Sequence, residues 1–553
     1  MFRAAARQVR PFVRPFTANG VISQARKSSA QAARNAVPKA SPPPPAFWTT
    51  GRVILFSSFT GALTYLYGVY DNGSFNAFKS GTSKPVYASQ KEMEKAITEL
   101  RTLFGADAIS TDDDDLRAHG YSEWSSVNID QLPVAVAYPR NTAQVSQIAQ
   151  VCHRYKIPMI PYSGGSSLEA NFSAPFGGVS IDFAHMDRII ELHAEDMDVV
   201  VQPAVPWMEL NEKIKDSGLF FPVDPGPSAK IGGMVGTSCS GTNAVRYGTM
   251  KEWVVNLTVV LADGSVIKTR RRPRKTSAGY NLTNLFIGSE GTLGIVTEIT
   301  LKLTVIPQET SVAVVPFPTI READSAAADI MRAGIQVGAM EIMDEVQMSV
   351  INRVKATKRT WKEAPTMFFK FSGTKAGVQE NIKLVKAIAK SHNAGNFEFT
   401  TDPQDQKELW SARKEALWSM LALREGDLDV WSTDVAVPLS RLPDIIEVSK
   451  KEMDDLGVFA SVLGHIGDGN FHESILYNKK DPKEYEAVKN CVYRMVDRAI
   501  EMDGTCTGEH SIGLGKKASL LKELGPETVE VMKSIKRALD PHWLLNPGKI
   551  MDH

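Results

Sequence analysis

Two histidines flank a short polar segment in GHIGDGNFHESIL, residues 464–476. On one straight strand His465 and His472 would point to opposite faces, because they are seven residues apart. The intervening GDGN favours a turn, and a strand–turn–strand arrangement would make the two imidazoles cross-strand neighbours. Two adjacent imidazoles supply half of a metal site, whereas a single histidine is more often an ordinary core or surface residue.

A carboxylate follows in GTCTGEHSIG, residues 504–513, where Glu509 stands beside His510. Glu509 could complete a site of two histidines and one carboxylate with open positions, which suits a divalent ion such as Zn or Mn. The sequence therefore predicts a divalent-metal site built from these two segments.

Three glycine-rich stretches could position a large ligand: PYSGGSSLEAN at 161–171, DPGPSAKIGGMVGTSCSGTNAVRYG at 224–248 and IGSEGTLGIVTEITLKL at 287–303. Successive backbone N–H groups in such turns can hold phosphates without many positive side chains. A flexible linker is the alternative for the middle stretch, but apolar runs flank it. A nicotinamide fingerprint is disfavoured because prolines interrupt the approach to the glycines, and no P-loop lysine follows them.

Together these stretches resemble the FAD-binding domain of vanillyl-alcohol-oxidase-type flavoproteins. That family often has a histidine bonded to the flavin in the first loop, where this chain has Ser166, so non-covalent FAD is expected. The implied FAD-binding residues are Pro161, Tyr162, Ser163, Gly164, Gly165, Ser166, Ser167, Leu168, Pro225, Gly226, Gly232, Gly233, Gly236, Ser240, Gly241, Asn243, Arg246, Tyr247, Gly248, Glu290, Gly291, Gly294, Ile295, Val296 and Asn546.

The two histidine-bearing segments also resemble the FAD-linked 2-hydroxy-acid dehydrogenases. The resemblance implies that His465, His472 and Glu509 bind the metal, with Asn470 nearby. It makes His510 the base that takes the proton of the substrate hydroxyl.

The same resemblance gives a role to Arg413 in LWSARKEALW, residues 409–418. A guanidinium can hold a substrate carboxylate through two parallel hydrogen bonds. From the residues alone, Arg413 could equally be a helix-surface charge beside Glu408 or Glu415.

The resemblance implies FAD-dependent oxidation of D-lactate to pyruvate, with cytochrome c as the electron acceptor. Oxidation of D-2-hydroxyglutarate or glycolate, with another flavoprotein or a quinone as acceptor, is the alternative within enzymes. A membrane-tethered scaffold that binds metal and flavin without turnover is the alternative from another class.

The N-terminus is basic and free of acids. Residues 1–45 contain eight basic residues, and no Asp or Glu occurs in the first 70 positions. This composition predicts a mitochondrial transit peptide over 1–45. A basic arm for nucleic acid is the alternative, but no basic domain accompanies it, so nucleic acid is not expected as a partner.

An uncharged run covers residues 53–70. Its length predicts a single membrane-anchor helix over 47–70, with a buried core helix as the alternative. The basic residues before it and Asp71 after it would place the body in the intermembrane space, anchored to the inner mitochondrial membrane. Without the transit peptide the chain has a net charge of −8, because the whole chain has 63 basic and 63 acidic residues.

The remainder is expected to be α+β. Strands alternate with amphipathic helices, among them a helix capped at Asn141 and a hairpin turning at Asp263-Gly264. The predicted domains are a two-subdomain FAD-binding domain at 85–305, a cap (substrate) domain with an antiparallel sheet at 306–525, and a C-terminal segment at 526–553 returning to the FAD-binding domain. The RRRPRK run at 270–275 is expected to be a solvated face, with a partner or lipid-headgroup site as the alternative.

Overall fold

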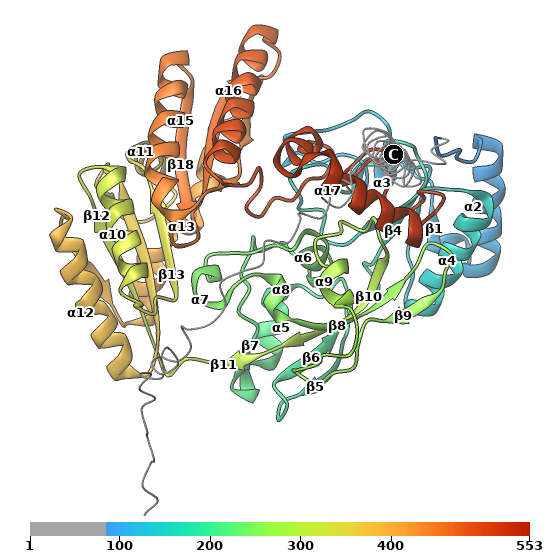
Figure 1. Ribbon diagram of the computed structural model, residues 1–553, viewed down its shortest axis with the longest axis horizontal. Coiled ribbons are helices and arrows are strands. Elements are labelled where there is room, and N and C mark those ends of the chain that lie inside the picture. The colour runs from blue at the N-terminus through green and yellow to red at the C-terminus, as the bar shows by residue number, and fades with distance from the viewer. Residues whose placement is uncertain (1–83) are drawn as a thin grey trace, which may run out of the picture. The chain divides into compact units, whose positions relative to one another are not determined.

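The computed structural model describes residues 84–553 (Figure 1). The predicted transit peptide at 1–45 and membrane anchor at 47–70 lie outside the described residues. Within residues 84–553 no helix is both long and apolar enough to cross a membrane.

A four-stranded sheet with the order β1-β2-β4-β3 begins the described chain. Its strands are β1 (Ile109–Ser110), β2 (Ala135–Ala137), β3 (Met159–Tyr162) and β4 (Val179–Asp182). Helices α2 (Gln90–Phe104) and α4 (Thr142–Tyr155) pack on it through one apolar core. The helix predicted behind Asn141 is confirmed, because the Asn141 side chain accepts from the backbone N–H of Gln144.

A second, five-stranded antiparallel sheet has the order β5-β6-β10-β8-β9. It consists of β5 (Ile189–His193), β6 (Asp198–Val201), β8 (Val254–Val260), β9 (Val266–Lys268) and β10 (Ile295–Lys302). The β8–β9 hairpin confirms the predicted turn, where Gly264 has a φ of +87° that favours glycine. In the basic run, Arg272 bonds Asp196 and Asp198 on the β5–β6 hairpin, so this arginine is paired within the domain.

An eight-stranded sheet forms the cap, and all its pairings are antiparallel, as predicted. The order is β15-β12-β14-β13-β18-β19-β16, with β17 also paired to β19. The strands are β12 (Glu309–Pro316), β13 (Ala339–Met343), β14 (Thr366–Gly373), β15 (Glu398–Thr400), β16 (Leu428–Ser432), β17 (Val435–Ala436), β18 (Phe459–His465) and β19 (Asn470–Asn478).

Two helical layers cover the two faces of this sheet. Alternate residues of β12 show the division, since Ala313 and Val315 join one core and Val312 and Val314 the other. The first core contains α10 (Ile320–Arg332), α12 (Lys375–Ser391), α15 (Leu442–Leu456) and α16 (Pro482–Glu501), which lie beside the sheet in Figure 1. The second contains α11 (Glu345–Val354), α13 (Pro403–Lys414) and α14 (Ala416–Leu421).

The helical stretch that contains Trp410 and Trp418 is broken into α13 and α14. Glu415 lies at the break with φ −89° and ψ 3°, outside the helical region. Arg413 therefore stands in the last turn of α13, beside the cavity described below.

The last part of the chain is α17 (Lys517–Leu539), which kinks at Gly525 and Pro526, followed by an irregular tail. The tail lies along β3: the backbone N–H of Met159 donates to Leu544 at 2.7 Å, and that of Asn546 donates to Met159 at 2.8 Å. Leu544 and Leu545 are fully buried in the core of the first sheet. The predicted domain boundary at 305 falls between β11 (Thr304–Val305) and β12, and the one at 525 falls at the kink.

Candidate active site

A cavity of about 600 Å³ lies between the FAD-binding loops and the cap sheet. One wall, which we call the glycine wall, is formed by residues drawn from the segments 161–168, 224–242 and 289–296. The other, which we call the charged wall, carries side chains of β14, β18, β19, α13 and the segment 509–510. All five residues predicted for catalysis and metal binding line this one cavity, although they are up to 97 positions apart in sequence, from Arg413 to His510.

Most residues predicted to bind FAD also line the cavity. They are Pro161, Tyr162, Ser163, Gly164, Gly165, Ser166, Ser167, Leu168, Pro225, Gly226, Gly232, Gly233, Gly236, Ser240, Gly241, Glu290, Gly291, Gly294, Val296 and Asn546. The others named by the sequence do not line it: Asn243, Arg246, Tyr247, Gly248 and Ile295.

The residues outside the cavity have other contacts. The Asn243 amide donates to the carbonyl of Pro222 at 3.0 Å, and Arg246 donates to the carbonyl of Ser372 on β14 at 2.8 Å. Ile295 is fully buried in strand β10. The Arg246 contact instead connects the glycine-rich segment to the cap sheet.

The glycines of α6 (Ile231–Thr237) differ in what a side chain at each position would contact. A Cβ on Gly232 would lie 2.6 Å from Cβ of Pro203, so this glycine is required by the protein's own packing. A Cβ on Gly236 would meet no atom of residues 84–553 within 4 Å, and one on Gly233 would meet none of them closer than 3.9 Å. Because both line the cavity, the space beside them is open to a ligand.

The three predicted metal ligands converge. Glu509 Oε1 lies 3.2 Å from His465 Nε2 and 3.2 Å from His472 Nε2. His465 and His472 are 6% and 5% exposed, so the group is buried. One carboxylate oxygen between two imidazole nitrogens is a donor set for a divalent ion.

The turn between the two histidines is confirmed, but they do not pair directly. The β18–β19 register places His465 opposite Asn470 and His472 opposite Leu463. The imidazoles are therefore diagonal neighbours on one face, with ring centroids 5.6 Å apart. Asn470 lies nearby, as expected, and its amide donates to Asp434.

Each ligand is oriented by a second partner that the sequence did not reveal. The Nδ1 of His465 lies 2.8 Å from Glu341 Oε1, and the Nδ1 of His472 lies 2.9 Å from the carbonyl of Thr433. Ser240 donates to Glu509 Oε2 at 2.6 Å. These contacts turn both Nε2 atoms and one carboxylate oxygen toward a common point, as outer partners do at metal sites.

Charge within this group is balanced by its own members. Burial opposes the charged imidazolium, yet the carboxylates of Glu341 and Glu509 raise the pKa of His465 well above its usual value. Burial also opposes ionisation of Glu509, yet His465 and His472 hold the pKa of its carboxyl well below the usual range. His465 therefore favours its cationic form and Glu509 its anionic form, and each stabilises the charge of the other.

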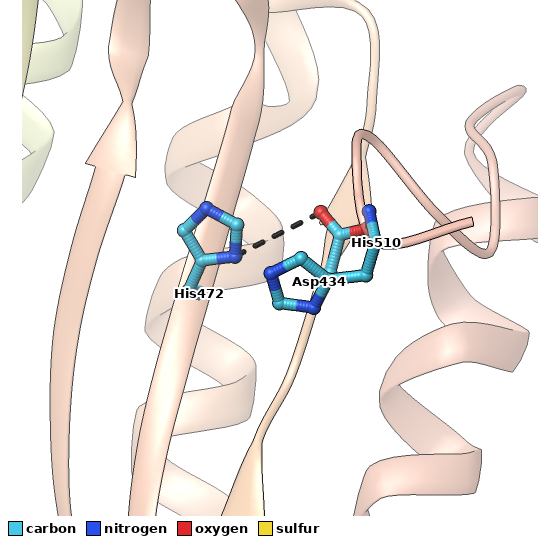
Figure 2. Close-up of side chains that lie close together, drawn as sticks. All are labelled: Asp434, His472 and His510. Atoms are coloured by element: carbon cyan, nitrogen blue, oxygen red, sulfur yellow. Dashed lines mark hydrogen bonds and ion pairs between the residues drawn. The ribbon is translucent and has the colours of Figure 1, made fainter. Parts of the chain in front are cut away.

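His510 stacks on His472, with ring centroids 5.0 Å apart and an interplanar angle of 12° (Figure 2). Its Nδ1 is buried and has no hydrogen-bond partner within residues 84–553. Burial lowers the pKa of His510 to about 4, so the imidazole is neutral at pH 7. A neutral, unpartnered imidazole on the cavity wall can accept a proton from a bound molecule.

Arg413 is not a surface charge, since its side chain is 12% exposed and pairs with the 1% exposed Glu341. Its Nε and Nη2 lie 2.9 Å and 2.8 Å from Glu341 Oε2. Glu341 thus bridges the guanidinium and His465 through its two oxygens. No local sequence signal marks Glu341, because it lies on β13, 72 positions before Arg413.

Two family models match the chain, the FAD binding domain over residues 133–270 and the C-terminal domain of FAD linked oxidases over residues 306–550. Among solved structures, a 4-ethylphenol oxidase from Gulosibacter chungangensis has the same fold. Its TM-score is 0.71 at 19% identity, covering 85% of this chain and 99% of that one.

Curated relatives cover most of the chain. The mitochondrial D-lactate dehydrogenase (cytochrome) of Kluyveromyces lactis is 50% identical, covering 84% of this chain and 82% of its own length. The protein of the same name from Arabidopsis thaliana is 46% identical, covering 86% of this chain and 83% of its own. This chain therefore belongs to the FAD-linked oxidase family, as a flavoenzyme related to the mitochondrial D-lactate dehydrogenases (cytochrome).

Proposed function

We propose that this chain oxidises D-lactate to pyruvate with non-covalent FAD and passes the electrons to cytochrome c. The single observation that carries the proposal is the convergence of Arg413, His510 and the three metal donors on one wall, opposite the glycine wall. The names of the most similar relatives supply the substrate and the acceptor.

The glycine wall fits FAD. Gly233 and Gly236 leave room where side chains would stand, and the loop 163–167 presents small residues to the same cavity. When bound, FAD would accept a hydride from C2 of the substrate. Ser166 offers no imidazole to bond the flavin, so acid precipitation is expected to release the yellow colour into the supernatant; colour retained in the pellet would contradict this.

The charged wall fits a divalent ion such as Zn or Mn. His465, His472 and Glu509 would be its ligands, and the outer contacts of Glu341, Thr433 and Ser240 would fix their orientation. When bound, such an ion lowers the pKa of a coordinated hydroxyl.

The chain's own residues account for binding and proton transfer. The Arg413 guanidinium, kept in place by Glu341, can receive the substrate carboxylate. The free Nδ1 of His510 can take the proton of the 2-hydroxyl group. The substrate would be held at Arg413 and at the metal site, with His510 as the base. These positions define which face of C2 is turned to the glycine wall, and so they account for a preference between enantiomers.

We place the protein in mitochondria, attached to the inner membrane through residues 47–70, with its body in the intermembrane space. The relatives are named as mitochondrial, and the sequence of 1–70 supports the rest. An acidic body would speed encounter with the basic cytochrome c. Carbonate extraction should leave the protein in the membrane, and reoxidation by cytochrome c should slow as salt is added.

The decisive experiment is anaerobic titration of the purified protein with D-lactate, L-lactate and D-2-hydroxyglutarate. The absorbance of the flavin band at about 450 nm is followed. Bleaching by D-lactate at low concentration, with little effect of the other two, is expected. Stronger bleaching by D-2-hydroxyglutarate would move the assignment to a dicarboxylate enzyme. A spectrum unchanged by every hydroxy acid would contradict the enzymatic function.

One feature of the cavity bears on the dicarboxylate alternative. Lys370 on β14 is a second cation on the cavity wall, 4.2 Å from the ring of Trp410, which is one helical turn from Arg413. Its Nζ donates to Thr242 at 3.1 Å and lies 3.6 Å from Asp224. A second substrate carboxylate would have to compete with Asp224 for this cation, which favours a monocarboxylate.

A further inference from the structure

The segment 507–513 carries both Glu509 and His510, yet it has no helix or strand of its own. A loop has no ladder of backbone hydrogen bonds to hold it, so side chains must satisfy its N–H groups. Positioning a metal ligand and a base to within a fraction of an ångström therefore requires dedicated contacts.

Asp434, which lies between β16 and β17 and beside His472 and His510 (Figure 2), supplies these contacts from the cap side. Its Oδ2 accepts from the backbone N–H of Glu509 at 3.0 Å, from that of His510 at 2.9 Å and from the hydroxyl of Thr507 at 2.7 Å. Its Oδ1 accepts from the Asn470 amide at 2.8 Å. One buried carboxylate thus contacts the backbone of both functional residues.

The charge of Asp434 is compensated locally. Its side chain has no exposed surface, and Lys516 places its Nζ 3.5 Å from Oδ2 and 3.0 Å from the carbonyl oxygen of the same residue. A buried carboxylate is tolerated only when it is paired and hydrogen-bonded, and both conditions are met here.

A second metal site formed by Asp434, His472 and His510 is the competing interpretation, since one ligand atom of each lies within 4.8 Å of the others. The carboxylate oxygens of Asp434 and the Nδ1 of His472 already have other hydrogen-bond partners. Oδ1 of Asp434, which lies 3.8 Å from the Nδ1 of His472, accepts from the Asn470 amide at 2.8 Å, and Oδ2 accepts from Thr507, Glu509 and His510. The Nδ1 of His472 lies nearer to the carbonyl of Thr433, at 2.9 Å. The contacts of Asp434 therefore fit a residue that positions the segment 507–513 and not a metal ligand.

A matching contact holds the other end of the segment. Glu290, which precedes β10, accepts from the backbone N–H groups of Ile512 and Gly513, both at 2.8 Å. The functional segment is thus held by one carboxylate from the cap and one from the FAD-binding domain.

We propose that Asp434 is a positioning residue, which holds the backbone at Glu509 and His510 so that the carboxylate faces the two histidines and the imidazole faces the substrate. Asp434 touches neither the substrate nor the metal in this role. The inference rests on the proposed function for its effect on turnover, but not for its effect on the segment itself.

The test compares Asp434→Asn with Asp344→Asn. Asp344 is a matched control because it is also a fully buried cap carboxylate that accepts from a backbone N–H, that of Gln347 at 2.7 Å, and pairs with a lysine, Lys450 at 2.6 Å. It lies outside the cavity. In D434N an amide N–H₂ replaces one acceptor oxygen, so a donor must face another donor.

Three quantities are measured in the full chain: Mn²⁺ affinity by calorimetric titration, hydrogen exchange of the peptide covering 505–514, and kcat with D-lactate. D434N is expected to weaken Mn²⁺ affinity and to lower kcat by about 10- to 100-fold each, the range for outer partners of metal sites, while FAD stays bound. Exchange at Glu509 and His510 should accelerate. D344N should match the wild type in all three.

Wild-type exchange in D434N, or equal loss of Mn²⁺ affinity in D344N, would overturn the positioning role. A wild type that binds no Mn²⁺ or oxidises no hydroxy acid would instead contradict the proposed function, and hydrogen exchange would still decide the role of Asp434. If D434N does not fold, Thr507→Val removes one of the same bonds and should show a smaller acceleration of exchange at the same amides.

Discussion

The glycine wall and the charged wall face the same cavity but are made from different parts of the chain. The glycine wall comes from three short stretches, each recognisable in the sequence by its composition. The charged wall gathers Arg413, His465, His472 and the 509–510 pair from α13, two strands and a loop.

The two walls also hold their groups by different means. Where the glycine wall leaves space, at Gly233 and Gly236, a ligand is recognised by shape and by backbone groups. On the charged wall Arg413 and His465 are instead fixed by one buried partner, Glu341. A change at Gly236 should therefore leave the metal donors in place, and loss of His510 or Arg413 should leave the flavin bound; the predictions test this independence.

The largest effect is expected on the charged wall from His510→Ala. Removal of the base should lower kcat for D-lactate by about 10²- to 10⁴-fold, the usual contribution of a general base, with FAD content and Mn²⁺ binding unchanged. Stopped-flow reduction of the flavin measures the step directly. The control is His392→Ala, which removes a histidine paired with Asp329 on the outside of the cap. Near-normal turnover in H510A would remove His510 from the mechanism.

Arg413→Lys should have the next largest effect. Lysine keeps the charge but not the planar fork, so it can neither receive a carboxylate bidentately nor keep both contacts to Glu341. We expect kcat/KM to fall by about 10- to 100-fold, the equivalent of one hydrogen bond to a charged group. The flavin spectrum should not change. Exposed Lys407→Arg, on the same helix but outside the cavity, is the control, and an unaltered kcat/KM in R413K would exclude a substrate contact.

The glycine wall should respond in the opposite way to Gly236→Ala. The added methyl group meets no protein atom and replaces a helical glycine, so the protein without FAD should be as stable as the wild type or more stable. In the complex the methyl group would enter the ligand's space, and we expect about 5- to 150-fold weaker FAD binding, the equivalent of about 1–3 kcal/mol for overpacking. Mn²⁺ affinity should be unchanged. Wild-type FAD affinity would show that FAD does not contact Gly236.

The difference between the walls also explains what the sequence could predict. Glycine loops, the cap at Asn141 and the hairpin turn at Asp263-Gly264 are local features, and they follow from a few adjacent residues. The antiparallel cap sheet followed from the spacing of strands and helices.

The partners of the charged wall left no such local signal. Glu341 lies 124 positions from His465, and Asp434 lies 76 positions from His510. Acidic residues are common, and nothing adjacent distinguishes these two. Their roles depend on strand register, which also decides that His465 and His472 are diagonal rather than opposite.

The smallest effect is expected away from both walls, at Asp324 on α10. This carboxyl is 3% exposed, and burial raises its pKa to about 8, opposed by Arg321 and reinforced by Asp444. Arg321 itself bonds Asp444 and Glu447, so it does not neutralise Asp324 as Lys516 neutralises Asp434. Asp324 is thus a buried carboxyl that the fold keeps protonated, in contrast to the ionised carboxylates of the charged wall.

The direction in which Asp324 changes stability with pH follows from its raised pKa. Since the folded pKa is above the unfolded value, the protonated carboxyl contributes stability fully at low pH, and this contribution is lost as pH rises toward about 8. Asp324→Asn cannot ionise, so its advantage over the wild type should grow by at most about 1.4 kcal/mol per pH unit up to that pH. Between pH 6 and 8 the melting temperature of D324N should gain about 5 °C on the wild type. Exposed Glu380→Gln on α12 is the control, and parallel curves for D324N and the wild type would show that Asp324 is ionised throughout, as a carboxyl with a lowered pKa such as that of Glu509 would be.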